Sequence, residues 1–452
     1  MNNQFLHSLV PDCRAATEVG IDVVVSRFEQ NAGYPFVDTK LNTRTGADFP
    51  ESADPESDFC GRSAVFGWIQ GRGLEALAGH AAFLVDNPAL VARCDGMLAT
   101  VAARMAAFGE ANQGRFVFLS TPDGRPFRCG ADGQREYFSA RTLSPGYSDL
   151  FMGKGLAAAG VRLGRPAWSE LGVTTFRSAA AAITSGQFES DQISFDPKNP
   201  VRPIPGRQAQ GPWMIALGGF ALMCELFPGE NEWVEGGVAF LRKLLGRHVI
   251  HQDSGPLRRF DFVEWTDNAG RPWQAQEQIL QDPGHALEFT GLAARFLLQT
   301  MERDALSPQN RELVAASREI LPEVFLAAFA NGFQRPVGGI CKTFDLVTRS
   351  SVNKDMPWWP LPEAMRAAAL LLRLAPDHPR RAELAAAAAD CARSLFGPFR
   401  SPVSGLFLQT RDSRGEPSRV IPATPDADPG YHTGLCLIDF VKTMENKGSL
   451  WR

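Results

Sequence analysis

The stretch that decides the fold runs through three segments, GRSAVFGWIQGRGLEALAGHA (61–81), PALVARCDGMLATVAARMAAF (88–108) and FVFLSTPDGRPFRC (116–129). The first is rich in glycine, alanine and aromatic residues, which is typical of a helix buried on all sides. The second carries an apolar stripe at helical spacing with charges opposite, which is typical of an outer helix with one wet face. The third has the form apolar–turn–apolar, and Pro-Asp-Gly supplies the residues that a hairpin turn requires.

The same unit recurs along the chain. Helical periodicity predicts helices near residues 10–30, 62–84, 87–112, 144–162, 166–185, 210–227, 230–249, 282–302, 308–331, 360–374, 379–397 and 430–445. Further apolar–turn–apolar pieces lie near 33–46, 260–273, 338–349 and 405–417. Alternating inner and outer helices that repeat every roughly 50–70 residues predict an all-α fold. We expect an (α/α)6 barrel of about twelve helices with short β-hairpins in the loops.

No linker divides the chain, so residues 1–452 are expected to form one barrel domain. The Pro-rich stretch 190–210 is interpreted as a long loop over one end of the barrel. Apolar residues make up 44% of the chain and charged residues 21%, which allows a substantial core.

Charge and cysteine usage exclude several function classes. A net charge of −4 with scattered Lys and Arg gives no footprint for nucleic acid. The apolar runs are shorter than the ~20 residues that a membrane span needs, and no signal peptide is visible. Eight separated cysteines without a CxxC pair argue against a zinc site and a redox motif. We therefore expect a cytoplasmic protein, with a homodimer as the default assembly.

Arg72 is the first candidate for chemistry. The inner helices of such a barrel begin at one mouth, so the polar residues of their first turns converge there. Arg72 follows Trp68 and Gln70 on the second predicted helix. A guanidinium is permanently charged and planar, and it can hold an enediolate oxygen. The alternative is a structural ion pair with a buried carboxylate.

Two helix entries share the sequence Asp-Pro-Gly, and each delivers a histidine. In residues 282–288 the aspartate is the expected N-cap and the proline the first helical residue. His285 and Glu288 then lie on one face. The positive end of the helix dipole is expected to lower the pKa of His285 and to favour the neutral imidazole that a general base needs. The second entry, residues 428–432, ends in His432, and the two imidazoles are expected to face each other.

A third entry has the sequence WWPLPE, with Trp358, Trp359 and Glu363. Aromatic faces pack on the apolar faces of pyranose rings, so two tryptophans with a carboxylate one turn on suit a sugar site; core aromatics with a capping glutamate are the alternative. The motifs GxxxxGK[ST], GxGxxG after a strand, GxSxG and HExxH are absent. We therefore expect no metal and no cofactor in the chemistry.

Together these segments resemble the N-acylglucosamine 2-epimerase superfamily, which also contains cellobiose 2-epimerases and the bacterial mannose and sulfoquinovose isomerases. The elements WIQGR, PGHALE, WWPLPEA and the late YH occur in the same order and at comparable spacing over most of the chain. The resemblance implies an (α/α)6 barrel and a small-molecule sugar substrate opened to its aldehyde form. It further implies proton transfer at C2 by two histidines through an enediolate.

The resemblance also implies a role for individual residues. His285 and His432 would be the acid/base pair, and Arg72 the partner of the oxyanion. Glu288 and Glu363 would orient the imidazoles or the substrate hydroxyls. Contacts to the sugar are expected from Trp68, Gln70, Trp358, Trp359, Tyr431 and Met214.

The same histidine pair can serve two reactions. Inverting C2 needs a base on each face of the planar intermediate, whereas moving the proton from C2 to C1 needs one base on one face. Two departures from the family pattern bear on this choice. Leu361 stands where many relatives have Gln or His, and residues 211–215 lack a histidine typical of the isomerase branch. The second departure favours an acylglucosamine-type epimerase over an aldose–ketose isomerase.

Two other functions remain open. A glycoside hydrolase or lyase on the same barrel would need two carboxylates that flank a scissile bond, and the candidates are Asp261, Glu264, Glu288 and Glu363. A non-catalytic sugar-binding relative would use the same pocket without turnover.

Overall fold

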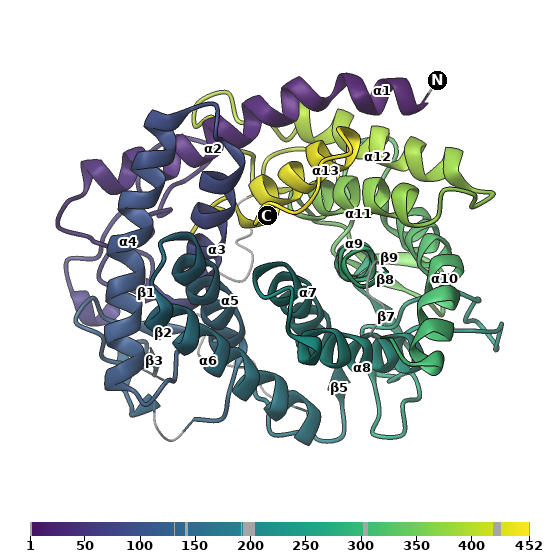
Figure 1. Cartoon of the computed structure of the whole chain (residues 1–452), viewed down its shortest axis with the longest axis horizontal. Helices are drawn as coiled ribbons and strands as arrows, with labels where there is room; N and C mark the ends of the chain where they lie inside the picture. Colours follow the sequence, from purple (N-terminus) through teal and green to yellow (C-terminus); the bar gives the residue numbers. More distant parts are fainter. Residues whose placement is uncertain are drawn as a thin grey trace.

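The computed structural model describes residues 2–130, 132–140, 143–190, 192, 204–301, 306–418 and 426–451. In this part of the chain two concentric rings of helices close into a barrel, which confirms the (α/α)6 prediction (Figure 1). The inner ring consists of α3 (Gly67–Phe83), α5 (Tyr147–Arg162), α7 (Gly211–Leu226), α9 (Pro283–Thr300), α11 (Pro360–Leu374) and α13 (Cys436–Met444). The outer ring consists of α2 (Val10–Gln30), α4 (Pro88–Ala111), α6 (Pro166–Ser185), α8 (Asn231–His248), α10 (Pro308–Gly332) and α12 (Arg381–Phe396), with the short α1 (Asn2–Ser8) ahead of α2.

Burial follows the two sequence patterns. Every residue of α5 from Ser148 to Gly160 is buried, because this inner helix is covered on all sides. The outer helix α8 instead buries a stripe that includes Trp233, Leu241 and Leu244 and leaves its other face to solvent. The prediction of a Gly- and Ala-rich inner ring and an amphipathic outer ring is thus confirmed for these helices.

Glycines allow the inner helices to approach closely. A side chain at Gly71 of α3 would bring its Cβ to 2.5 Å from the backbone of Phe151, and one at Gly155 of α5 would bring its Cβ to 2.4 Å from the carbonyl oxygen of Gly71. Each inner helix contacts the next around the ring, and the turn η3 (Tyr431–Leu435), which leads into α13, contacts α3 and closes it.

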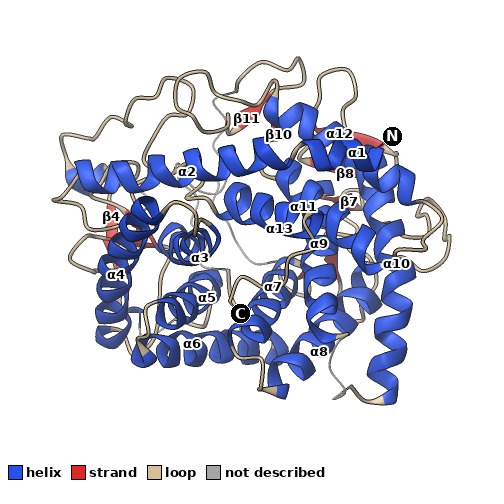
Figure 2. Ribbon diagram, turned by 45° about the horizontal axis from the view of Figure 1, so that its top comes forward, coloured by secondary structure: helices blue, strands red, loops and turns tan. Residues whose placement is uncertain are grey.

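The strands are short and lie in the connections between helices (Figure 2). Four of the five predicted hairpins pair with the strand that enters the preceding inner helix, whereas the one predicted near 33–46 forms an isolated bridge between Leu41 and Asp48 and no strand. These pairs are β1 (Val65–Phe66) with β2 (Leu119–Ser120), β5 (Gln208–Ala209) with β6 (Trp265–Thr266), β7 (Leu280–Gln281) with β8 (Thr343–Asp345), and β10 (Met356–Pro357) with β11 (Thr410–Arg411). The strand β9 (Ser350–Asn353) extends β8, and β3 (Phe127–Cys129) pairs with β4 (Arg135–Tyr137). The hairpins therefore gather at the end of the barrel where the inner helices begin.

Three further features bear on the sequence predictions. Most of the predicted loop at 190–210 lies outside the described residues. All eight cysteines are free thiols. No helix in the described ranges is both long and apolar enough to cross a membrane.

Candidate active site

A cavity of about 540 Å³ opens at the end of the barrel where the inner helices begin. Most of the predicted site residues line it: Trp68, Arg72, Met214, His285, Glu288, Trp358, Trp359 and His432. They come from five of the inner helix entries. The structure therefore brings into one space side chains that are up to 364 positions apart in the sequence, from Trp68 to His432.

Three predicted site residues do not line the cavity. Gln70 turns away from it: its Oε1 accepts from the backbone N–H of Val37 at 2.8 Å, and its Nε2 donates to the Val37 carbonyl. Gln70 thus ties an N-terminal loop to α3, which corrects its predicted role as a sugar contact. Tyr431 and Glu363 lie directly behind the cavity wall, where they contact residues that do line it.

His285 stands on the first turn of α9. The Asp282 carboxylate caps this helix by accepting from the N–H of Gly284 at 2.9 Å. The Nδ1 atom of His285 lies 3.0 Å from Glu264 Oε1 and 3.5 Å from Asp282 Oδ2. Burial alone would lower the pKa of His285, but Asp282 and Glu264 outweigh it and raise the pKa to about 9.

His285 is therefore an imidazolium at neutral pH. The prediction that the helix dipole keeps this residue neutral is wrong. Two full negative charges close to the ring act more strongly than the partial positive charge of a helix terminus.

His432 lies in η3, a single π-helical turn, and such turns are frequent at functional sites. Gly430 begins this turn with a φ of 91°, a left-handed conformation that glycine adopts without strain. The Asp428 carboxylate accepts from the N–H groups of Tyr431, His432 and Thr433. This cap fixes the direction in which the His432 side chain leaves the backbone.

The His432 ring is held from behind by a carboxylate. Its Nδ1 lies 3.0 Å from Glu363 Oε1, and the other oxygen of Glu363 pairs with Arg366. Burial raises the pKa of Glu363 while Arg366 opposes this effect, and the ion pair favours the ionised carboxylate. Burial, assisted by the positive charge of Arg72, lowers the pKa of His432 to about 4. At neutral pH His432 is thus uncharged, with Nδ1–H donating to Glu363 and a lone pair on Nε2.

Trp359 links the two histidines. The centroid of its ring system lies 5.4 Å from that of His285 and 5.5 Å from that of His432. Both imidazoles therefore contact one indole in one cavity, and they are in opposite charge states.

Arg72 faces the same cavity from α3. Its guanidinium carbon lies 4.2 Å from the ring centroid of Phe151 and 5.4 Å from that of Tyr431. Its Nε is buried without a hydrogen-bond partner, and none of the ion pairs within the described ranges involves it. Burial lowers the pKa of Arg72. Among the described residues Arg72 therefore does not form the structural ion pair that the sequence left open, which leaves the guanidinium available to an anionic group.

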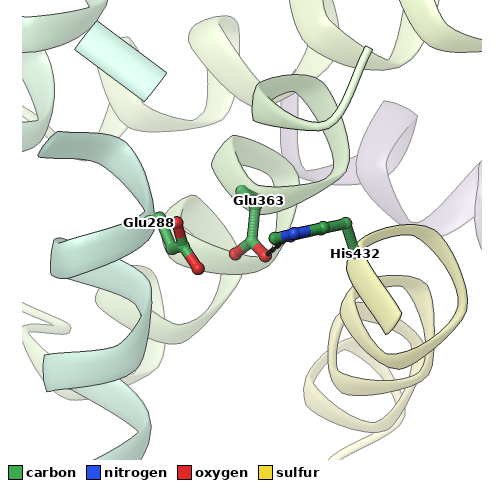
Figure 3. A group of neighbouring side chains, drawn as sticks. All are labelled: Glu288, Glu363 and His432. Atoms are coloured by element: carbon green, nitrogen blue, oxygen red, sulfur yellow. Dashed lines mark hydrogen bonds and ion pairs between the residues drawn. The ribbon is translucent and has the colours of Figure 1, made fainter. Parts of the chain in front are cut away.

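Glu288 points from α9 toward Glu363 and His432 (Figure 3). It is 5% exposed, and no hydrogen bond or ion pair joins its carboxylate to another residue of the described part of the chain. Burial and the charge of Glu363 raise the pKa of Glu288. One ligand atom from each of these three residues lies within 4.8 Å of the others, so the group has the chemistry and spacing to hold a metal ion.

Two charged residues that line the cavity interact with His285 or with the cap of its helix, and neither interaction was predicted from the sequence. Glu264, considered there only for hydrolysis, is the carboxylate that pairs with His285. Lys342 lines the cavity, donates to Asp282 Oδ2 at 2.6 Å and lies 5.6 Å from the Trp359 ring centroid. Neither carries a sequence signal, because each reaches the site through the pairing of a hairpin with a neighbouring strand.

A buried ion pair supports the site from inside the barrel. Lys154 of α5 lies 2.9 Å from Glu75 of α3, and its ammonium donates to the Tyr431 hydroxyl at 2.6 Å. Burial lowers the pKa of Lys154. Neither charged residue belongs to a motif that would predict it from the sequence.

Comparisons with known proteins agree with this architecture. The cellobiose 2-epimerase from Spirochaeta thermophila DSM 6192 is similar with a TM-score of 0.66 at 14% identity, over 98% of this chain and 98% of that chain. A D-mannose isomerase gives a TM-score of 0.64 at 14% identity, over 94% and 97%. A family 76 glycoside hydrolase (mannosidase) from Bacteroides thetaiotaomicron VPI-5482 gives 0.51 at 12% identity, over 96% and 99%. At these identities the likeness shows a shared fold.

The sequence comparison identifies the family. No curated protein sequence matched the chain. The family model of N-acylglucosamine 2-epimerase (GlcNAc 2-epimerase) matches residues 146–436, which is more than half of the sequence. The chain belongs to the N-acylglucosamine 2-epimerase family.

Proposed function

We propose that this protein epimerises a sugar at C2 by moving a proton from one face of an enediolate to the other. The observation that carries the proposal is the pair of histidines in one cavity, each backed by a glutamate and both within 5.5 Å of the Trp359 ring. One imidazole is neutral and the other is charged at neutral pH. A base and an acid are thus present together.

The proton transfers follow from these charge states. His432 Nε2 takes the C2 proton of the open-chain aldose, and the electron pair of the C–H bond moves onto the carbonyl oxygen. His285 then gives its proton to C2 from the opposite face. The product is the C2 epimer, and the protein is left with His432 protonated and His285 neutral until the two exchange protons with solvent.

Arg72 supports this reaction electrostatically. A proton next to a carbonyl is a weak acid, so that the enediolate needs a preorganised positive charge. The guanidinium of Arg72 lies in the same cavity, has no ion-pair partner among the described residues, and supplies this charge. Trp359 offers a flat apolar surface between the two imidazoles, on which the sugar carbons can lie.

An aldose–ketose isomerase is the second candidate, since one histidine would return the proton to C1 and the same residues would serve. Met214 and Ile215 form an apolar wall of the cavity, at the place where the isomerase branch is expected to carry a histidine, which favours epimerisation.

A glycoside hydrolase has less support. Glu264 is engaged by His285, and Asp261 and Glu363 do not line the cavity. Of the four carboxylates considered for hydrolysis, Glu288 alone faces the cavity without a partner among the described residues.

The experiment is incubation of the protein with free hexoses, N-acetylhexosamines and cellobiose in deuterated water, followed by NMR. Formation of the C2 epimer with one deuteron at C2 is expected. A ketose product would identify the isomerase instead. Release of a reducing sugar from an oligosaccharide, or no turnover of any sugar, would contradict the proposal.

A further inference from the structure

We infer that Glu288, Glu363 and His432 form a binding site for a borderline-soft divalent cation such as Zn²⁺, and that occupation of this site inhibits the sugar reaction. The inference concerns cation binding, which is independent of turnover. Only the inhibition rests on the proposed function.

The geometry of the three side chains fits one small ion. The ligand atoms lie within 4.8 Å of one another, and they come from three different elements, α9, α11 and η3 (Figure 3). Zn²⁺ binds carboxylate oxygen and imidazole nitrogen at about 2.0–2.2 Å, so two of its ligands lie up to about 4 Å apart. Binding therefore requires the Glu288 carboxylate, which has no partner among the described residues, to move closer to the other two ligands.

Glu288 gives an independent reason to expect a ligand here. The residue is 5% exposed, and its carboxylate has no partner among the described residues, although buried polar groups are nearly always paired. It points at Glu363 and His432 (Figure 3). The Glu363 carboxylate lies beside Glu288. Because both groups are acceptors, a cation is a better partner for Glu288 than a further hydrogen-bond acceptor would be.

The surroundings meet two further requirements of a metal site. Arg366 pairs with the Glu363 oxygen that does not face His432, which fixes the orientation of that ligand as outer-shell partners of metal sites do. Glu288 and His432 also line the cavity of about 540 Å³, which gives the ion an entry path.

The ligand set selects the class of cation. Imidazole suits zinc, copper and nickel, whereas Mg²⁺ and Ca²⁺ prefer sets made of oxygen alone. Three protein ligands leave one position of a tetrahedral zinc ion open, and two of these ligands, Glu288 and His432, line the cavity in which the sugar is proposed to bind.

Inhibition follows from the role of His432. A cation on Nε2 removes the lone pair that would take the C2 proton. A cation on Nδ1 displaces the proton from that atom, and the neutral ring then carries its proton on Nε2. In both cases His432 is no longer a base on the side of the substrate.

The test is titration of the metal-free full-length protein with Zn²⁺, followed by calorimetry, and with Co²⁺, followed by its visible absorption bands. We expect binding of one ion per chain with a four-coordinate Co²⁺ spectrum. The variant Glu288→Gln should bind at least about 10-fold more weakly, because losing a ligand costs no less than losing an outer-shell partner. Asp355→Asn is the matched control, since this carboxylate lines the same cavity outside the cluster, and it should keep the wild-type affinity for Zn²⁺.

Two further measurements keep the inference falsifiable. Zn²⁺ should shift the imidazole NMR signals of His432 in the unaltered protein, which does not depend on whether the Glu288 variant folds. In a turnover assay Zn²⁺ should inhibit in competition with the sugar, and a chelator should restore activity. Absence of Zn²⁺ binding, or equal binding by wild type and Glu288→Gln, would overturn the inference even if the protein turns over a sugar.

Discussion

Replacing Glu264 by Gln should shift the alkaline limb of the pH–activity profile to lower pH. Asp282 and Glu264 raise the pKa of His285 from 6.5 to about 9 against the effect of burial, which corresponds to about 3 kcal/mol in favour of the imidazolium. Glu264 is the nearer of the two carboxylates. An opposite charge at this distance shifts a pKa by about 1–3 units, so its loss should lower the pKa of His285 by at least about one unit. The amide keeps the size of the side chain and removes its charge.

The assay is kcat/KM as a function of pH, with the sugar that the NMR panel identifies. The wild type should lose activity below about pH 4, where His432 becomes protonated, and above about pH 9, where His285 loses its proton. Removal of the negative charge at residue 264 lowers the pKa of His285, so the upper limit should fall to about pH 8. The lower limit should stay in place.

Asp267→Asn provides the matched control. This carboxylate belongs to the same hairpin but faces Arg271 at the surface, and its loss should leave both limits unchanged. An upper limit that stays near pH 9 in the Glu264 variant, or that rises, would refute the assignment of His285 as the acid.

Three further outcomes follow from the structure. Arg72→Met should lower kcat by about 10²- to 10³-fold with little change in KM, as loss of an oxyanion partner does; a change confined to KM in steady-state kinetics would count against this role. Lys342→Met should raise the upper pH limit, because the Lys342 ammonium lowers the pKa of His285, and a profile that moves down instead would contradict that. Lys154→Met should cost about 3 kcal/mol in the free energy of unfolding measured with urea, because Glu75 loses its buried partner; a cost below about 1 kcal/mol would show that the pair is not held as described.

The helix arrangement was predictable because each helix repeats one of two burial patterns. The apolar stripe of α8 indicates a helix with one face in solvent, and the small residues of α5 indicate a helix that is enclosed on all sides. The hairpins were predictable because their turns need residues such as Gly124 and Gly270, which adopt positive φ. The turn η3 was not, since the sequence near residue 430 continues a helical pattern and gives no sign of a π turn.

The charge states in the site were not predictable from the sequence. Glu264 precedes His285 by 21 positions, and it reaches the histidine because its backbone N–H donates to the carbonyl of Leu280 in β7, the strand that leads into α9. Asp282 was visible in the sequence, but it was interpreted only as the N-cap of the helix, although its charge raises the pKa of His285. The helix terminus alone gives the wrong sign for that pKa. Lys342 arrives at the same place from the hairpin after α10. Long-range pairing of charges depends on the register of the connections, which local patterns do not encode.

The most direct test of the two-faced reaction is hydrogen exchange at C2 in the variants His285→Ala and His432→Ala. Each variant keeps one histidine, and it should exchange the C2 proton of one epimer with deuterated water, without inverting it, at a pH at which that histidine is neutral. This pH is near neutrality for His285→Ala and above about 9 for His432→Ala. The account predicts that the two variants exchange opposite epimers. Exchange of the same epimer by both variants would place both bases on one face of the sugar, and exchange by neither would remove the histidines from the reaction.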